Sequence, residues 1–448
     1  MNSTALTLFF RVDMLFFCLY AALLLVFGLL EARRRDASSF FVNARRSGPW
    51  QTGFSLLGAA VGGSATVGVA GLAWQVGAPA FWWMGSLALG FACMALFLAR
   101  SVNESGAWTM PELVEQWLGR PARLLAACLI VPGWVLILAA QFTAVGKLAA
   151  VLTGLSPEAA LAASAAVLVL YSALGGQASV IRSDLPQGLI LLFGLLAGTA
   201  CLFLRDASPL LSLDLHLIND AFGPERALSF LLVMGGSCLA GPTMFGVLLS
   251  AKDAPSARRG AWLAAFALVL ASLLVTAFGV LCRGLVPAAT APDDVLPAAV
   301  ALMPEWAGMA MLAALFSAML SSADSCLVTA AAVLCNDLLR RRSAALCRGA
   351  ALALGLLGWL IAAQGFSILG LMLAACNACM CGLLGPVLAS RLLAFLNLPS
   401  ASSSPRLCAA AVLSGGLLGL SPSLPASSAA LALSFALTLA AGVMRKRY

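Results

Sequence analysis

Long apolar stretches alternate with short polar loops along the whole sequence. Each stretch holds about 20 mostly apolar residues, the length that an α-helix needs to cross the hydrocarbon core of a bilayer. The loops between the stretches are too short to hold a folded soluble domain. The pattern predicts an all-α integral membrane protein with about 13 transmembrane helices. The expected spans are residues 12–31, 50–75, 79–100, 124–152, 157–176, 184–204, 227–250, 259–284, 305–338, 346–364, 367–394, 406–421 and 426–444.

Two of these spans contain helix-breaking residues near their middle. The second span reads LGAAVGGS at Leu57–Ser64, and the seventh reads GGSCLAGP at Gly235–Pro242. Glycine pairs and proline weaken a helix and release backbone carbonyls, although glycine is also common in packed membrane helices. Released carbonyls are tolerated in hydrocarbon only where they line a cavity or are buried in protein. Matched interruptions in two halves of a membrane chain are the best sequence pointer to a transporter's binding site. We therefore expect a binding site where these two interrupted spans meet.

The composition and the placement of charge agree with a membrane protein. The chain is 62% hydrophobic and 10% charged, whereas soluble domains carry about 25% charged residues. If the spans alternate in direction, the basic clusters all fall on one side, which is typical of cytoplasmic loops. We therefore expect a multi-pass protein of the plasma (inner) membrane with its N-terminus outside and its C-terminus cytoplasmic. The net charge of +8 then reflects orientation in the lipid bilayer, and we expect no nucleic-acid partner.

Cysteine and histidine offer little for catalysis. Most of the 13 cysteines lie inside apolar runs, where they behave as small hydrophobic residues. Cys376, Cys379 and Cys381 have a metal-like spacing, but a zinc site normally uses four ligands, so chance in a cysteine-rich helix is the favoured interpretation. The one histidine, His216, lies in an expected loop. A membrane-embedded enzyme would need a nucleophile and base pair or a metal cluster, and we therefore do not expect an enzyme.

Two carboxylates, Asp184 and Asp324, fall within or at the mouth of expected spans. An acidic side chain in a membrane is costly and marks a functional site by default. Around Asp324, helical periodicity gathers oxygen-bearing groups on one face: the Ala318 carbonyl and the hydroxyls of Ser321, Ser322 and Ser325. Small hard cations prefer such a surface, but serines also bond back to their own helix. For Asp184, which follows a short basic loop, a helix N-cap is the alternative role.

Several segments, in the same order along the chain, resemble the sodium:solute symporter family. They are Ser38–Val42 with Gly48–Trp50, Trp108–Leu113, Tyr171–Gly176 with Ser183–Gln187, and Ser321–Ser325. The likeness covers about residues 12–394 and implies a LeuT-like fold of two inverted five-helix repeats with two broken helices. The implied parts are 1–49 (an extra helix and cytoplasmic loop), 50–204 (first repeat), 205–226 (extracellular loop), 227–394 (inverted repeat) and 395–448 (two C-terminal helices).

The resemblance also implies a sodium site. Its ligands would be the backbone carbonyls of Gly58 and Val61 in the first broken helix, together with the Ala318 carbonyl and the hydroxyls of Ser321 and Ser322. Asp184 matches the family's aspartate near the inner end of this site. There it would help sodium to leave or would form a second cation position with Ser325.

A small organic solute is expected where the two broken helices cross. Ala65 and Trp82 stand where the family's sugar-binding members have glutamine and glutamate, which disfavours a sugar. The seventh span has no tyrosine to act as a gate, so Phe81 or Phe245 would take that role. Lys147 is expected to extend to the outer surface. The candidate contacts, each of which is more often a packing residue, are Ser64, Ala65, Thr66, Gln75, Phe81, Gln141, Thr243, Phe245 and Asn377.

These observations favour a sodium-coupled symporter that imports a carboxylate or amino-acid-like solute by alternating access. A proton-coupled symporter with Asp184 or Asp324 as the proton carrier is the first alternative. A non-transporting membrane sensor on the same fold would need a signalling domain, and the sequence ends at Arg445–Tyr448 directly after the last span. The identity of the solute, the number of ions and the oligomeric state stay open.

Overall fold

The computed structural model describes residues 36–366, 368–398, 400–420 and 424–443, together with Ala22, Leu25, Val26 and Leu29. The first expected span, residues 12–31, therefore lies largely outside the described residues, and the basic stretch Arg445–Tyr448 lies wholly outside them. The described chain is helical, and its only extended pairing consists of two isolated bridges, Ser47 with Ala251 and Asn219 with Phe222. This confirms the prediction of an all-α protein for the described part of the chain.

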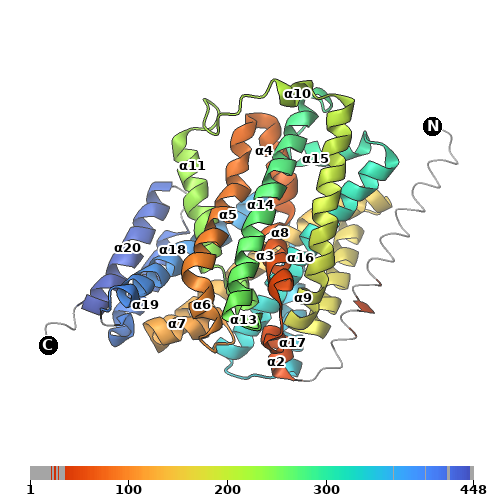
Figure 1. Cartoon of the computed structure of the whole chain (residues 1–448). Coiled ribbons are helices and arrows are strands. Elements are labelled where there is room, and N and C mark those ends of the chain that lie inside the picture. Colours follow the sequence, from red (N-terminus) through yellow and green to blue (C-terminus); the bar gives the residue numbers. More distant parts are fainter. Residues whose placement is uncertain are drawn as a thin grey trace.

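The helices form one bundle (Figure 1), in which α10 and α15 lie at one end and α2, α7 and α13 at the other. The first half contains α2 (Ala37–Val42), α3 (Pro49–Ala60), η2 (Ser64–Gly68), α4 (Val69–Val76), α5 (Trp82–Cys93), α6 (Ala99–Asn103), α7 (Met110–Leu118), α8 (Arg120–Thr153) and α9 (Pro157–Arg205). The second half contains α10 (Ser208–Leu211), α11 (Pro224–Phe230), η5 (Leu231–Gly235), α12 (Gly236–Ala240), α13 (Pro242–Ser250), α14 (Ala254–Leu281), η7 (Pro292–Asp294), α15 (Val295–Ala301), α16 (Glu305–Val333), η8 (Leu334–Leu338), α17 (Ala344–Ala362), α18 (Ile368–Phe395), α19 (Pro405–Leu418) and α20 (Leu424–Val443).

Seven described helices are long and apolar enough to cross a membrane, and two bent pairs raise the number to nine. One of the seven, α9, has 49 residues, which at about 1.5 Å per residue is more than twice the thickness of a bilayer core. Gly176 interrupts it with φ 59° and ψ −153°, a conformation that side-chain-bearing residues avoid. The loop expected at residues 177–183 is wrong, because the helix resumes directly after Gly176. The total of 13 spans stays a prediction.

Both expected helix breaks are confirmed. The first separates α3 from η2 and α4 with a bend of 69°, and the second separates α12 from α13 with a bend of 41°. At the first break Val61 is extended, and the two glycines that follow allow α8 to come close. A Cβ atom on Gly62 would lie 2.5 Å from the Gln141 side chain, and one on Gly63 would lie 2.7 Å from Ala144 Cβ. The glycine pair therefore lets the helix break and lets the broken backbone pack directly against α8.

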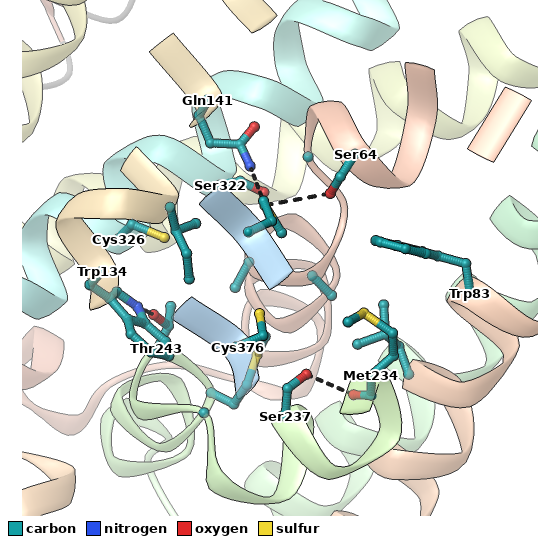
Figure 2. Close-up of a pocket in the computed structure, with 18 residues that line it drawn as sticks. Ser64, Trp83, Trp134, Gln141, Met234, Ser237, Thr243, Ser322, Cys326 and Cys376 are labelled. Carbon is teal, nitrogen blue, oxygen red and sulfur yellow. Dashed lines mark hydrogen bonds between the residues drawn. The ribbon is translucent and has the colours of Figure 1, made fainter. Parts of the chain in front are cut away.

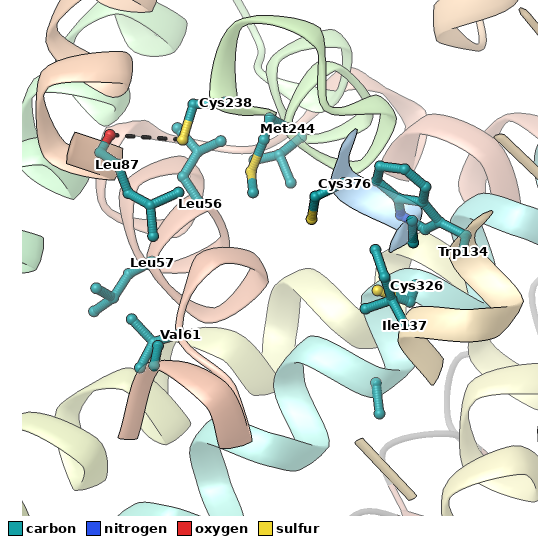
Figure 3. Close-up of a cluster of buried hydrophobic side chains, with 14 of the residues drawn as sticks. Leu56, Leu57, Val61, Leu87, Trp134, Ile137, Cys238, Met244, Cys326 and Cys376 are labelled. Carbon is teal, nitrogen blue, oxygen red and sulfur yellow. Dashed lines mark hydrogen bonds between the residues drawn. The ribbon is translucent and has the colours of Figure 1, made fainter. Parts of the chain in front are cut away.

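The centre of the bundle is occupied by α16. In the most apolar stretch of this span, 94% of the residues are buried inside the protein. Small residues permit this close packing, as they do in other membrane bundles. On α9, for example, a Cβ atom on Gly194 would lie 2.2 Å from the Ala310 carbonyl oxygen of α16. Figure 3 shows the apolar side chains that surround the first break, including Leu56, Leu57 and Val61. The break therefore lies inside protein, where released carbonyls are tolerated.

Candidate cation and solute site

Ser322 of α16 lies against the backbone released at the first helix break. Its Oγ is 2.7 Å from the Gly58 carbonyl oxygen and 3.0 Å from the Val61 carbonyl oxygen. A serine hydroxyl has one proton and can donate to only one of these carbonyls at a time. Three oxygens from α3 and α16 therefore converge at one buried point. Ala318, the remaining residue of this expected ligand set on α16, lies one helical turn before Ser322 and is buried.

Ser321, the neighbour of Ser322, faces α9. Its hydroxyl donates to Asp184 Oδ1 at 2.5 Å. Gly58 lies beside this pair, since a Cβ atom on it would be 2.0 Å from Ser321 Oγ and 3.2 Å from Asp184 Oδ1. The alternative role that the sequence left open for Asp184, a helix N-cap, is wrong, because the residue lies well inside the helix that follows Gly176. We call Gly58, Val61, Ala318, Ser321, Ser322 and Asp184 the oxygen cluster.

A second buried carboxylate, Asp324, lies on the next turn of α16. It accepts a hydrogen bond from the Tyr171 hydroxyl, which also lies 2.8 Å from Ser183 Oγ. Asp184 Oδ2, Asp324 Oδ1 and Ser325 Oγ have no hydrogen-bond partner among the described residues. An ionised carboxylate without a partner is very costly inside a protein. Each of the two carboxylates accepts one hydrogen bond, from Ser321 or from Tyr171, but its second oxygen has none. A cation or a proton on these second oxygens would stabilise the pair.

A central cavity of about 70 Å³ lies between the two helix breaks. Ser322 is part of its lining, so the cavity adjoins the oxygen cluster. Figure 2 shows Trp83 and Trp134 facing it from opposite sides. No charged side chain of the described chain belongs to the lining. The lining comprises Ala59, Ala60, Gly62, Ser64, Trp83, Leu87, Trp134, Ile137, Gln141, Met234, Ser237, Gly241, Thr243, Met244, Ser322, Cys326, Met372 and Cys376.

The polar groups of this cavity are mostly donors that lack a strong acceptor. Gln141 accepts the Gly63 N–H at 3.0 Å, while its Nε2 points at the Met372 sulfur at 3.7 Å. The Ser64 hydroxyl points at the same sulfur at 3.5 Å. A thioether is a weak acceptor, so both donors are available to a better one. Thr243 accepts from the Trp134 indole at 2.5 Å, which leaves the threonine proton available too.

Three of the nine expected solute contacts, Ser64, Gln141 and Thr243, line the central cavity. The other six lie outside its lining for physical reasons. The hydroxyl of Thr66 bonds back to the Gly62 carbonyl at 3.0 Å, and Phe245 is fully buried in the apolar core. The Phe81 ring packs on Gly85, and Gln75 lines other chambers. The remaining two, Ala65 and Asn377, are buried but do not belong to the lining.

Sequence reasoning missed most of the cavity wall. Trp83 and Trp134 line it, whereas Trp82 donates its indole N–H to the Leu217 carbonyl in the loop after α10. Trp83, the residue after Trp82, is therefore the one that faces the central cavity. Tryptophans inside spans next to a broken helix could have indicated the cavity wall, because a buried indole N–H needs a hydrogen-bond partner.

The three closely spaced cysteines of α18 do not form one site. Cys376 lines the central cavity, Cys379 donates to the Leu129 carbonyl at 3.7 Å, and Cys381 donates to the Ser427 carbonyl at 3.5 Å. The three sulfurs thus have different neighbours. Across the described ranges, no group of three His, Cys, Asp or Glu side chains is placed to hold a metal ion.

Comparison with known proteins identifies relatives. The model of the sodium:solute symporter family matches residues 40–364. The chain is 26% identical over 300 residues to the sodium/pantothenate symporter of Haemophilus influenzae, covering 62% of this chain and 60% of that protein. It is 22% identical over 379 residues to the sodium/glucose cotransporter of Vibrio parahaemolyticus, covering 73% of this chain and 68% of that protein. It thus spans 60% of the pantothenate symporter's length.

A solved structure of a Na+-coupled sialic acid symporter, in a substrate-bound outward-open state, is similar to this one with a TM-score of 0.78. The two chains share 16% sequence identity, and the similarity covers 97% of this chain and 98% of the other. At this identity the likeness shows the fold, which confirms the expected LeuT-like architecture. The family match covers well over half of the 448 residues, and this chain therefore belongs to the sodium:solute symporter family.

Proposed function

We propose that the protein is a sodium-coupled symporter that moves a small organic solute across the membrane by alternating access. Sodium is then a co-transported ion and not a resident cofactor. The single observation that carries this proposal is the position of Ser322 Oγ, within 3.0 Å of two carbonyl oxygens released by the first helix break. Membership of the family supports the same conclusion.

Sodium would be held by the oxygen cluster. When the ion enters, Ser322 turns its proton away and offers a lone pair, and the Gly58 and Val61 carbonyls turn from the hydroxyl to the ion. The Ser321 hydroxyl and the Ala318 carbonyl would complete the set of ligands. The ion then links α3 to α16 more strongly than one shared proton does. The membrane potential contributes about 2.3 kcal/mol per charge per 100 mV to this coupling.

Asp184 and Ser325 would form a second cation position or the exit path of the first ion. Their unpartnered oxygens support this role, and Asp324 lies in the same group through Tyr171 and Ser183. The same observation favours a second candidate function, in which a proton on one of the two carboxylates drives transport. Sodium dependence of binding separates the two functions.

The solute would carry an acceptor oxygen on a largely apolar body. Gln141, Ser64 and Thr243 offer donors, while tryptophan and sulfur-containing side chains form much of the wall. A carboxylate fits this arrangement, because the N-terminal end of η2 adds a positive dipole and sodium would lie nearby. A hydroxyl-rich sugar would leave many of its polar groups without partners.

Tryptophan fluorescence tests the proposal without knowledge of the solute, because Trp83 and Trp134 line the cavity beside Ser322. Purified protein is titrated with sodium, potassium and lithium. We expect a saturable response to sodium that is lost in Ser321→Ala/Ser322→Ala. Ser390→Ala is the matched control, since among the described residues this buried serine donates to the Val387 carbonyl of its own helix and has no other partner. Folded wild-type protein that gives no sodium-specific response would contradict sodium coupling.

A further inference from the structure

Two hydrogen-bond donors in the wall of the central cavity point at the same atom. Gln141 Nε2 lies 3.7 Å from the Met372 sulfur, and Ser64 Oγ lies 3.5 Å from it. Figure 2 shows the two side chains directed toward the same place, where the dashed lines meet. A thioether is a weak acceptor, whereas each of the two oxygens of a carboxylate is a strong one. The two donors therefore form a binding position for a carboxylate.

The orientation of Gln141 is fixed by the first helix break. Its Oε1 accepts the Gly63 N–H at 3.0 Å, so the amide turns its NH2 group toward the cavity. The backbone packs directly on this amide, since a Cβ atom on Gly62 would lie 2.5 Å from Nε2. Reversing the amide would leave the buried Gly63 N–H without an acceptor, which is costly. This end of the cavity therefore offers donors and selects an anion.

An ammonium group has three donors and no acceptor, and the central cavity suits it poorly. Among the described residues, no charged side chain lines the cavity. The carbonyls that the first break releases, at Gly58 and Val61, face Ser322 and would hold sodium. On the second broken helix, the Met234 carbonyl already accepts from the Ser237 hydroxyl at 2.7 Å. An α-amino acid would therefore leave its ammonium group without a strong partner.

The central cavity is also small. Its volume is about 70 Å³, whereas a cavity that admits benzene has about 150 Å³. By proportion it holds roughly three or four non-hydrogen atoms, and the flexible Met372 side chain can turn aside for a slightly larger solute. Trp83 and Trp134 limit the cavity on opposite sides (Figure 2), and the hydrogen bond from Trp134 to Thr243 holds one of these walls in place. The cavity thus excludes an aromatic ring or a long chain.

We propose that the transported solute is a short monocarboxylate of the size of acetate or propionate, without an ammonium group. Its two oxygens accept from Ser64 and Gln141, and its alkyl end packs on Ile137 and Trp134. Sodium in the oxygen cluster supplies the opposite charge, because Ser322 belongs both to the cluster and to the cavity wall. The inference rests on the proposed function, since it names the solute class of the same site.

The test uses probes that each differ from propionate in one property. Propionamide has the same shape but no charge, L-alanine adds an ammonium group, and hexanoate and benzoate add bulk. Purified wild-type protein is titrated with sodium, and each probe is then added at saturating sodium. Tryptophan fluorescence is the readout, because Trp83 and Trp134 line the cavity. We expect propionate to bind at least tenfold more tightly than each of the other probes.

Ile137→Ala tests the size limit through a gain of binding. Ile137 lines the cavity, and its truncation leaves extra space there. Hexanoate should therefore bind this variant at least tenfold more tightly than it binds wild-type protein. Ile130→Ala is the matched control, because Ile130 lies on the same helix and is fully buried but does not belong to the lining. It should leave the order of the probes unchanged, and both variants should keep the sodium response.

Any of the other probes binding wild-type protein as tightly as propionate would overturn the inference. An Ile137→Ala protein that responds to sodium but binds hexanoate no better than wild type would overturn it too. Wild-type protein that responds to sodium but binds no propionate would also overturn the solute class and leave the proposed symport intact. A missing sodium response, seen before any probe is added, would instead contradict the proposed function, and propionate binding measured afterwards would still decide the solute class.

Discussion

Ser321 and Asp184 join α16 to α9 through a hydrogen bond of 2.5 Å. Gly58 of α3 packs so closely on this pair that any side chain at position 58 would collide with Ser321. Three helices thus meet through one hydroxyl, one carboxylate and one bare backbone. This contact connects the first helix break to Asp184, a fully buried carboxylate.

Gly58→Ala should abolish the sodium response. The new methyl group would lie 2.0 Å from Ser321 Oγ, so the serine and the helix must move apart. Overpacking of this kind costs about 1–3 kcal/mol of stability. The measurement is thermal unfolding with and without sodium. Gly68→Ala is the control, because a Cβ atom there meets nothing within 4 Å. A Gly58→Ala protein that sodium stabilises as well as wild type would refute the packing argument.

Asp184→Asn should weaken sodium binding at least tenfold, which corresponds to about 1.4 kcal/mol. The amide preserves the size of the side chain and the contact with Ser321 but removes the negative charge. The readout is the sodium concentration at half-maximal fluorescence change. If the substitution instead leaves sodium binding intact and removes a dependence of uptake on external pH, then Asp184 carries a proton.

Ser64→Ala should weaken binding of the transported solute about twofold to twelvefold, the range for one lost hydrogen bond of about 0.5–1.5 kcal/mol. Met372→Leu should leave the affinity nearly unchanged, because a solute oxygen replaces the sulfur as acceptor for Ser64 and Gln141. Competition binding with the solute found by sodium-driven uptake measures both. If Met372→Leu causes the larger loss, the thioether is itself a solute contact.

Arg123→Met should destabilise the protein by about 3–5 kcal/mol, because it leaves a buried charge without its partner. Asp337 is fully buried, and its carboxylate lies 2.8 Å from the Arg123 guanidinium. Adding Asp337→Asn should restore part of the lost stability, since the amide still accepts from Thr109. Thermal unfolding of the single and double variants gives the answer. A double variant less stable than Arg123→Met would show that the ion pair is not the main contribution.

The sequence pattern was sufficient for the fold class and for both helix breaks, since glycine pairs and proline in an apolar run have direct backbone consequences. The boundaries around Gly176 were wrong, because polar residues such as Arg182 and Ser183 looked like a loop. In the structure the Ser183 side chain is buried between helices, where it bonds to Tyr171. The tertiary environment therefore decided where the helix begins.

The candidate cation ligands could be proposed from spacing and resemblance because serines three and four residues apart share a helix face. The solute cavity could not be proposed in the same way. Its wall consists largely of tryptophan, methionine and cysteine residues, whose sequence pattern does not differ from that of an ordinary membrane helix. Only the bend between η2 and α3 and the approach of α8 show which of them face the cavity.

Binding of radioactive sodium to purified wild-type protein and to Ser322→Ala tests the central claim most directly. The account predicts saturable binding to wild-type protein that potassium does not displace, at least tenfold weaker binding to Ser322→Ala, and unchanged binding to Ser390→Ala. Equal sodium binding by wild-type protein and Ser322→Ala would contradict the account, because the oxygen cluster would then not hold the ion through Ser322.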